Sequence, residues 1–121
     1  MAKRVMTVDD SKTMRDMVTI TLRNAGFEVS AAEDGRQALT MLQNHPVDVV
    51  ITDLNMPVMD GVTLIRNLRA DPKFRATPIL MLTTESDPSK KNDGRNAGAT
   101  GWIVKPFQPD KLVEIVNKVC G

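Results

Sequence analysis

The sequence predicts an α/β fold in which five parallel strands form one doubly wound sheet with helices on both faces. Short apolar runs alternate with amphipathic segments five times along the chain, which is typical of repeated strand–helix units. The runs at 47–52 and 78–82 are nearly all apolar, as expected for strands that are covered on both faces. Right-handed crossovers would then place helices on both sides of the sheet. At 121 residues, the chain has the size of one domain.

The first two strands and helices follow in chain order. A strand at 3–8 leads into a helix that ends before Gly26, a residue type common just beyond helix ends. A second strand at 27–32 precedes a helix at 34–44. The apolar sides of these helices carry Met14, Met17, Val18, Thr21, Leu22 and Ala25 in the first and Ala38, Leu39 and Leu42 in the second. As fillers of core gaps we expect Met6, Met14, Met17, Met41 and Met81.

The third strand, at 47–52, is followed by a helix for which Asp60 is the predicted N-cap. The apolar side of this helix carries Val62, Leu64, Ile65 and Leu68. The run at 78–82 is the fourth strand. Both strands are short and bounded by polar residues or proline, which favours strands over helices for these apolar runs.

The fourth helix, at 87–99, is the weakest predicted element. It contains Gly94 and few large apolar residues, so both its helix propensity and its packing are predicted to be poor. A strand at 101–104 and a helix at 109–120 complete the pattern. The apolar stripe of this last helix consists of Leu112, Ile115, Val116 and Val119.

Composition excludes several functions. The formal net charge of +1 gives no basic surface for nucleic acid or an anionic membrane. No apolar stretch approaches the roughly 18 residues of a membrane span, and the basic N-terminus lacks the apolar run of a secretory signal. The single cysteine, Cys120, excludes an internal disulfide and suits a reducing compartment. We therefore expect a cytoplasmic protein that binds neither nucleic acid nor membranes.

Residues that can bind a metal ion or a phosphoryl group follow four of the five predicted strands. Asp9 and Asp10 follow the first, Asp53 the third, Thr83 the fourth and Lys105 the fifth. In an open parallel sheet the strand ends share one edge, and ligands bind there. If the first and third strands are neighbours, three carboxylates converge, and they need a cation or raised pKa values. Mg²⁺, a hard ion with oxygen ligands, is the predicted cofactor.

A carboxylate at such an edge can act as a nucleophile toward phosphorus and form an aspartyl phosphate. Phosphoryl transfer needs mainly positioning and charge stabilisation from the protein. Lys105 would supply a compact positive charge, and Thr83 a hydroxyl donor. The alternative is that Asp10 only caps the first helix and Asp53 only begins a loop.

At these residues the chain resembles the receiver domain of two-component response regulators, specifically the single-domain chemotaxis (CheY-like) type. The motifs that carry the resemblance are V-D-D-S at 8–11, I-T-D-L-N-M-P-V-M-D-G at 51–61, M-L-T-T-E at 81–85 and G-W-I-V-K-P-F at 101–107. They occur in the family's order and spacing, so the resemblance covers residues 1–121 as one receiver domain. It implies a flavodoxin-like strand order of 2-1-3-4-5.

The resemblance also implies a role for each site residue. Asp53 would accept a phosphoryl group from a phosphohistidine of a partner kinase or phosphotransfer protein. Asp9, Asp10, Asp53 and the backbone carbonyl of Asn55 would hold Mg²⁺. Thr83 would turn toward the phosphoryl group, Lys105 would pair with it, and the Lys105–Pro106 peptide would be cis. Asn55 and Glu85, which flank the pocket, would tune the phosphoryl lifetime.

Trp102 stands where the chemotaxis relatives usually carry tyrosine. The resemblance implies that this aromatic changes exposure as Thr83 moves. An indole donates a hydrogen bond but does not accept one as a phenol does, and it needs a larger pocket. The alternative is a partly buried surface tryptophan without a switching role.

The resulting function is that of a monomeric signalling switch, which catalyses only its own phosphorylation and dephosphorylation. Its output partner, a flagellar motor switch protein or a kinase, would bind the surface of the fourth helix, fifth strand and fifth helix. A phosphorelay intermediate or phosphate sink is the alternative within the family. A haloacid-dehalogenase-type phosphatase is a distant alternative, because Asn55 stands where that family needs an acidic proton donor. We expect Lys90, Lys91 and Arg95 to form a solvated helix face.

Overall fold

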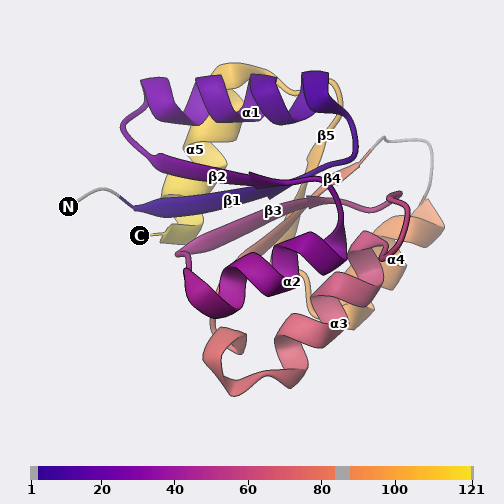
Figure 1. The fold of residues 1–121 in the computed structure, drawn as a ribbon. Helices are drawn as coiled ribbons and strands as arrows, with labels where there is room; N and C mark the ends of the chain where they lie inside the picture. The colour runs from indigo at the N-terminus through magenta and orange to yellow at the C-terminus, as the bar shows by residue number, and fades with distance from the viewer. Residues whose placement is uncertain (1–2, 84–87, 121) are drawn as a thin grey trace.

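The computed structural model describes residues 3–83 and 88–120, in which five parallel strands form one sheet (Figure 1). The strand order is β2-β1-β3-β4-β5, as predicted. The strands are β1 (Arg4–Val8), β2 (Glu28–Ala32), β3 (Val49–Asp53), β4 (Ile79–Thr83) and β5 (Gly101–Val104). Since all neighbouring strands pair in parallel, their carboxyl ends lie at one edge of the sheet.

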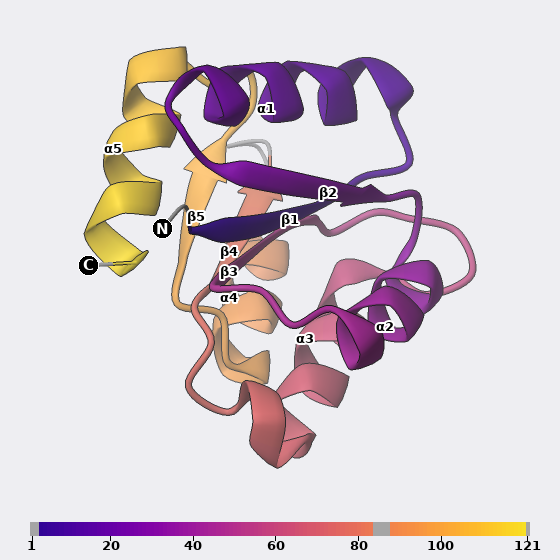
Figure 2. The ribbon, with the colours of Figure 1, turned by 60° about the vertical axis from the view of Figure 1, so that its left-hand side comes forward.

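Helices cover both faces of the sheet, which confirms the doubly wound arrangement (Figures 1 and 2). One face is covered by α1 (Lys12–Asn24) and α5 (Pro109–Cys120). The other is covered by α2 (Gly35–Asn44), α3 (Gly61–Ala70) and α4 (Pro88–Ala97). No helix in the described ranges combines the length and the apolar character that crossing a membrane requires.

Side-chain caps fix where the first three helices begin. Ser11 accepts a hydrogen bond from the backbone N–H of Met14 at 3.2 Å and caps α1. Asp34 caps α2 in the same way, and Asp60 caps α3 as predicted. The α1 cap is therefore Ser11 and not Asp10, which removes the structural role that the alternative gave to Asp10.

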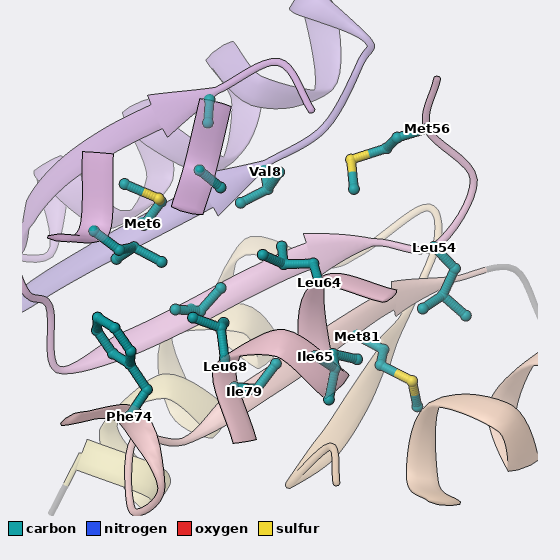
Figure 3. Packing of buried hydrophobic residues seen from close by; sticks show 14 residues of the cluster. Met6, Val8, Leu54, Met56, Leu64, Ile65, Leu68, Phe74, Ile79 and Met81 are labelled. Atoms are coloured by element: carbon teal, nitrogen blue, oxygen red, sulfur yellow. The ribbon is translucent and has the colours of Figure 1, made fainter. Parts of the chain in front are cut away.

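Two apolar clusters fill the space between the sheet and its two helix layers. Alternate residues of each strand point to opposite faces, so Met6 and Met81 join the α2–α3 side (Figure 3), whereas Val5 and Leu80 join the α1–α5 side. The sheet is therefore covered on both faces by separate cores.

The prediction that Met17 lies in the core is wrong. Its side chain is 45% exposed, while Val18 and Leu22 of the same helix are fully buried. Met17 lies about 100° around the helix from Val18, which places it beside the buried stripe. Helical spacing alone did not distinguish the buried positions of the helix from the partly exposed position beside them.

A short 3₁₀ helix, η1 (Pro72–Phe74), was not predicted. It begins at Asp71, whose carboxylate accepts the N–H of Lys73 at 3.0 Å. The turn places Phe74 in the α2–α3 core, where it is 1% exposed (Figure 3). A single turn contains too few residues to produce a periodic pattern, so η1 could not be predicted from periodicity.

Helix α4 forms despite its weak propensity, and it packs through a glycine. Within the described residues, Gly94 is the one buried position of α4. A Cβ atom at Gly94 would lie 1.8 Å from Sδ of Met81, so the helix lies close against β4 and a larger residue would require the Met81 side chain to move. Beyond its C-terminal end, Arg69 donates to the carbonyl oxygen of Gly98 at 2.9 Å. This helix therefore has a narrow contact with the sheet and a fixed C-terminal end.

Candidate functional site

The carboxyl edge of the sheet brings the predicted strand-end residues together. β1 and β3 are neighbours with Val8 paired to Thr52, so the residues that follow, Asp9 and Asp53, lie side by side. One carboxylate oxygen from each of Asp9, Asp10 and Asp53 lies within 4.8 Å of the others. Convergence of the three carboxylates, which the sequence left conditional on strand order, is therefore present.

Lys105 brings a positive charge to the same cluster. Its Nζ lies 3.1 Å from Oδ1 of Asp53 and 3.4 Å from Oδ2 of Asp9. Its backbone N–H donates to the carbonyl oxygen of Thr83 at 2.8 Å, so the turn after β5 is tied to the end of β4. The peptide bond between Lys105 and Pro106 is cis, the isomer that the resemblance implies.

The negative charge of Asp9 is energetically unfavourable at its buried position. Burial raises the pKa of Asp9, and the nearby carboxylate of Asp53 raises it further. The backbone N–H of Ser11, which donates to Oδ1 of Asp9 at 2.9 Å, and the ammonium of Lys105 act in the opposite direction. Because the pKa is raised overall, the fold without metal disfavours the ionised carboxylate.

The donor set fits a hard divalent cation. Within the described part of the chain, the buried Oδ2 of Asp9 has no hydrogen-bond donor, although Lys105 lies nearby. Asp9 is 1% exposed and Asp53 is 7% exposed, whereas Asp10 is exposed and leaves one side of the cluster open. A buried carboxylate oxygen beside two further carboxylates supplies the oxygen ligands that Mg²⁺ takes, and the open side leaves room for water and phosphate oxygens. A contribution from the backbone carbonyl of Asn55 stays a prediction.

Thr83 and Trp102, the two residues that the resemblance gives a switching role, lie at the end of β4 and on β5. Thr83 ends β4 and is 6% exposed, next to the turn that carries Lys105. Trp102, on β5, is 36% exposed, and the Nζ of Lys91 lies 5.4 Å from its ring centroid. Arg95 approaches the same ring to 5.1 Å, so Lys91 and Arg95 cover an aromatic face and are not merely solvated. Glu85, the second predicted tuning residue, lies outside the described residues.

Three residues that support the site were not predicted. Arg15 of α1 donates to the backbone carbonyl of Asp9 at 2.7 Å. A Cβ on Gly61 would lie 2.2 Å from the carbonyl oxygen of Asp53, so this glycine lets α3 start directly against the end of β3. Lys90 of α4 donates to the side-chain oxygen of Asn55. Each contact joins separate elements, so no local pattern could have indicated it.

Comparison with known proteins identifies the family of this chain. A model of the response regulator receiver domain matches residues 5–117. The chain belongs to this family. Receiver domains are signalling proteins of two-component systems, which are phosphorylated and then interact differently with partner proteins, and they bind Mg²⁺ at an acidic pocket.

Relatives of this receiver domain include chemotaxis proteins. It is 41% identical to the chemotaxis protein CheY-3 of Vibrio cholerae over 96% of this chain and 90% of the relative. The solved structure of CheY4 of Vibrio cholerae is 48% identical with a TM-score of 0.93, over 98% of this chain and 99% of that one. The receiver domain of the histidine kinase PA1611 from Pseudomonas aeruginosa is 26% identical with a TM-score of 0.93, over 100% of this chain and 99% of that one. That structure has a magnesium ion coordinated in its active-site cleft.

Replacing Asp9 with asparagine is expected to stabilise the metal-free receiver domain by about 1 kcal/mol, because a buried, poorly paired charge is removed. The raised pKa of Asp9 predicts the same direction of change. Ionisation is less favourable in the folded than in the unfolded state, so the free energy of unfolding falls as the pH rises from the ordinary carboxyl range through the folded-state pKa. The same variant should bind Mg²⁺ about tenfold more weakly or worse, because a charged ligand is lost. Urea unfolding in EDTA and calorimetric Mg²⁺ titration measure the two effects. A variant that is less stable than wild type in EDTA would contradict the prediction.

The loop after Asp53 contains a strained residue. Val58 has a φ of 69°, and the N–H of Met59 donates to the carbonyl oxygen of Pro57 at 2.8 Å, which closes a three-residue turn around Val58. A β-branched side chain is unfavourable at positive φ. Val58 is 75% exposed, so its side chain contributes little packing to compensate.

Val58→Asn is therefore expected to raise the free energy of unfolding by about 1 kcal/mol, because asparagine tolerates the left-handed region. Urea denaturation measures the change. Val58→Thr is the matched control, since threonine keeps the branched Cβ and should give no comparable gain. Equal stability of the asparagine and threonine variants would show that this strain is not significant.

Proposed function

We propose that this receiver domain is a phosphorylation-controlled switch in which Asp53 accepts a phosphoryl group from a phosphohistidine of a partner kinase or phosphotransfer protein. One observation carries the proposal: the Asp53 carboxylate lies 3.1 Å from the ammonium of Lys105 and beside the carboxylates of Asp9 and Asp10. A nucleophile, a countercharge and a ligand set for a cation thus meet at one point. Chemotaxis is the proposed setting, because the relatives named above are chemotaxis proteins.

In the proposed reaction a carboxylate oxygen of Asp53 forms a bond to phosphorus. The bond from phosphorus to the donor's imidazole nitrogen breaks, and that nitrogen keeps the electron pair. Asp9 and Asp10 would hold Mg²⁺, which supplies positive charge to the transferring phosphoryl oxygens. Lys105 would move its pairing from the carboxylates toward the new phosphoryl charge, and Thr83 would donate a hydrogen bond to one phosphoryl oxygen.

The output surface is proposed to consist of α4, β5 and α5. A groove of about 570 Å³ runs along β5 and α5, and its lining includes Trp102, Phe107, Lys111, Ile115 and Lys118. The lining combines apolar residues with Lys111, Lys118 and Glu114, so cations outnumber acids. This composition favours a partly apolar partner segment with acidic residues, such as one of a flagellar motor switch protein or a kinase. A change in the exposure of Trp102 after phosphorylation would alter this surface. The monomeric state, the cytoplasmic location and the restriction of catalysis to self-phosphorylation and dephosphorylation stay predictions.

Labelling by a small phosphodonor tests the proposal without knowledge of the kinase. Wild-type protein incubated with acetyl phosphate and Mg²⁺ should gain the mass of one phosphoryl group per chain. The same incubation in EDTA should leave the mass unchanged, and hydroxylamine should remove the label, as expected for an acyl phosphate. Sustained hydrolysis of p-nitrophenyl phosphate over many turnovers would instead support the phosphatase alternative.

A further inference from the structure

The first turn of α4 contacts the loop that follows the proposed phosphorylation site through the side chain of Lys90. Lys90 of α4 donates through Nζ to Oδ1 of Asn55, a residue 35 positions earlier in the chain. Asn55 is exposed and lies two residues after Asp53 on the loop that leaves β3. The contact therefore joins the loop at the opening of the site to the helix of the proposed output surface.

The surroundings of Lys90 favour this contact over free solvation. Lys90 is half-buried, and with Asn55 it lines a cavity of about 320 Å³ between α3 and α4. Arg66 also lines this cavity and adds a second positive charge, while Asp60 and Asp93 supply negative charges. The carboxylate of Asp60 accepts the N–H of Thr63 at 2.8 Å as the cap of α3. A cation of α4 is therefore held in a charged pocket beside the loop.

Among the described residues, α4 packs mainly against α3, and its one buried position is Gly94. Gly94 is the narrow point of contact with β4, and Arg69 holds the chain just beyond the C-terminal end. Lys90 precedes Gly94 by about one turn. Lys90 therefore attaches the N-terminal part of α4 to the loop that follows β3.

We propose that Lys90 is a positioning residue for Asn55 and that it thereby sets how fast the phosphoryl group leaves Asp53. This inference rests on the proposed function. With its carbonyl oxygen held by Lys90, the Asn55 amide has a fixed orientation, and its NH₂ group is the end that can donate elsewhere. A fixed side chain at the opening limits the approach of the water that hydrolyses the acyl phosphate. Without the hydrogen bond from Lys90, the exposed side chain of Asn55 regains its rotamer freedom, and water reaches the acyl phosphate more easily.

The expected effect of Lys90→Met is an increase of about two- to fivefold in the dephosphorylation rate constant, the size of a single partly exposed polar interaction. Protein labelled with acetyl phosphate is freed of donor by desalting, and the loss of label is followed by mass spectrometry. Lys90→Arg keeps a charged donor and should restore most of the wild-type lifetime. Lys73→Met is the matched control, because Lys73 lies in η1, contacts Gln43 and is remote from the strand-end edge.

A double-mutant cycle distinguishes positioning from a general charge effect. Lys90→Met should add nothing in an Asn55→Ala background if Lys90 acts through Asn55. An unchanged effect of Lys90→Met in that background, or a wild-type decay rate for Lys90→Met alone, would overturn the inference. If wild-type protein is not labelled at all, it is the proposed function that fails.

A second measurement does not depend on phosphorylation. In the unphosphorylated protein, the side-chain amide resonances of Asn55 should shift in Lys90→Met and stay in place in Lys73→Met. Unmoved Asn55 resonances in Lys90→Met would show that the tether does not exist in solution and would also overturn the inference.

Discussion

Replacing Asp53 with asparagine is expected to reduce Mg²⁺-dependent labelling by acetyl phosphate by about a thousandfold or more. The amide has nearly the shape of the carboxylate but is a poor nucleophile and carries no charge. Asp53 accepts the backbone N–H of Leu54 through Oδ1 at 2.8 Å, and the amide oxygen can keep this bond. The variant should therefore fold normally, so that the loss is chemical. Intact-mass analysis after incubation with donor and Mg²⁺ measures it.

Asp48→Asn provides the matched control for this experiment. Asp48 accepts the backbone N–H of Arg4 at 2.8 Å, where β1 begins, at the opposite edge of the sheet from the carboxylate cluster. This variant makes the same chemical change without touching the site and should be labelled as wild type. Stoichiometric phosphate on Asp53→Asn would show that another residue is the acceptor.

Replacing Gly61 with alanine is expected to lower the free energy of unfolding by about 3 kcal/mol. A Cβ there would lie 2.2 Å from the carbonyl oxygen of Asp53 and 2.8 Å from Cα of Leu54. Both atoms belong to the backbone, so no side-chain rotation can relieve the overlap, and α3 must move away from the end of β3. Because the displaced backbone carries Asp53, labelling by acetyl phosphate should also become slower.

Urea denaturation measures the loss of stability, and Gly101→Ala controls for the change of residue type. A Cβ at Gly101 would meet only Cδ2 of Leu80 at 3.5 Å, an ordinary van der Waals distance. This control should stay within about 1 kcal/mol of wild type. A Gly61→Ala protein as stable as the Gly101→Ala protein would mean that α3 can shift at little cost.

Prediction from sequence was most successful where local pattern is decisive. The apolar runs correctly placed all five strands. β3 and β4 are buried at every position, as expected for central strands that are covered on both faces. Asp60 was correctly predicted as the cap of α3, because capping depends on a residue and its next three neighbours. Met17 was misplaced and η1 was missed, because neither a helix flank nor a single turn has a distinct periodicity.

In the candidate site too, sequence predicted what depends on local pattern and could not predict what depends on contacts between distant elements. By itself the sequence determined which residues stand at the strand ends: Asp9, Asp10, Asp53, Thr83 and Lys105 follow from reading each strand to its last residue. Periodicity could not show that β1 and β3 are neighbours; the resemblance implied it, and the structure places the two strands side by side.

Only the tertiary structure decided how these residues interact. It brings Lys105 to within 3.1 Å of Asp53 and joins Lys90 to Asn55. It also buries Oδ2 of Asp9 with no hydrogen-bond donor among the described residues. Strand and helix formation depends on residues a few positions apart, whereas these contacts join elements that are far apart in sequence. They exist because packing the helices on the sheet fixes the distances between them, and no local pattern in the chain contains those distances.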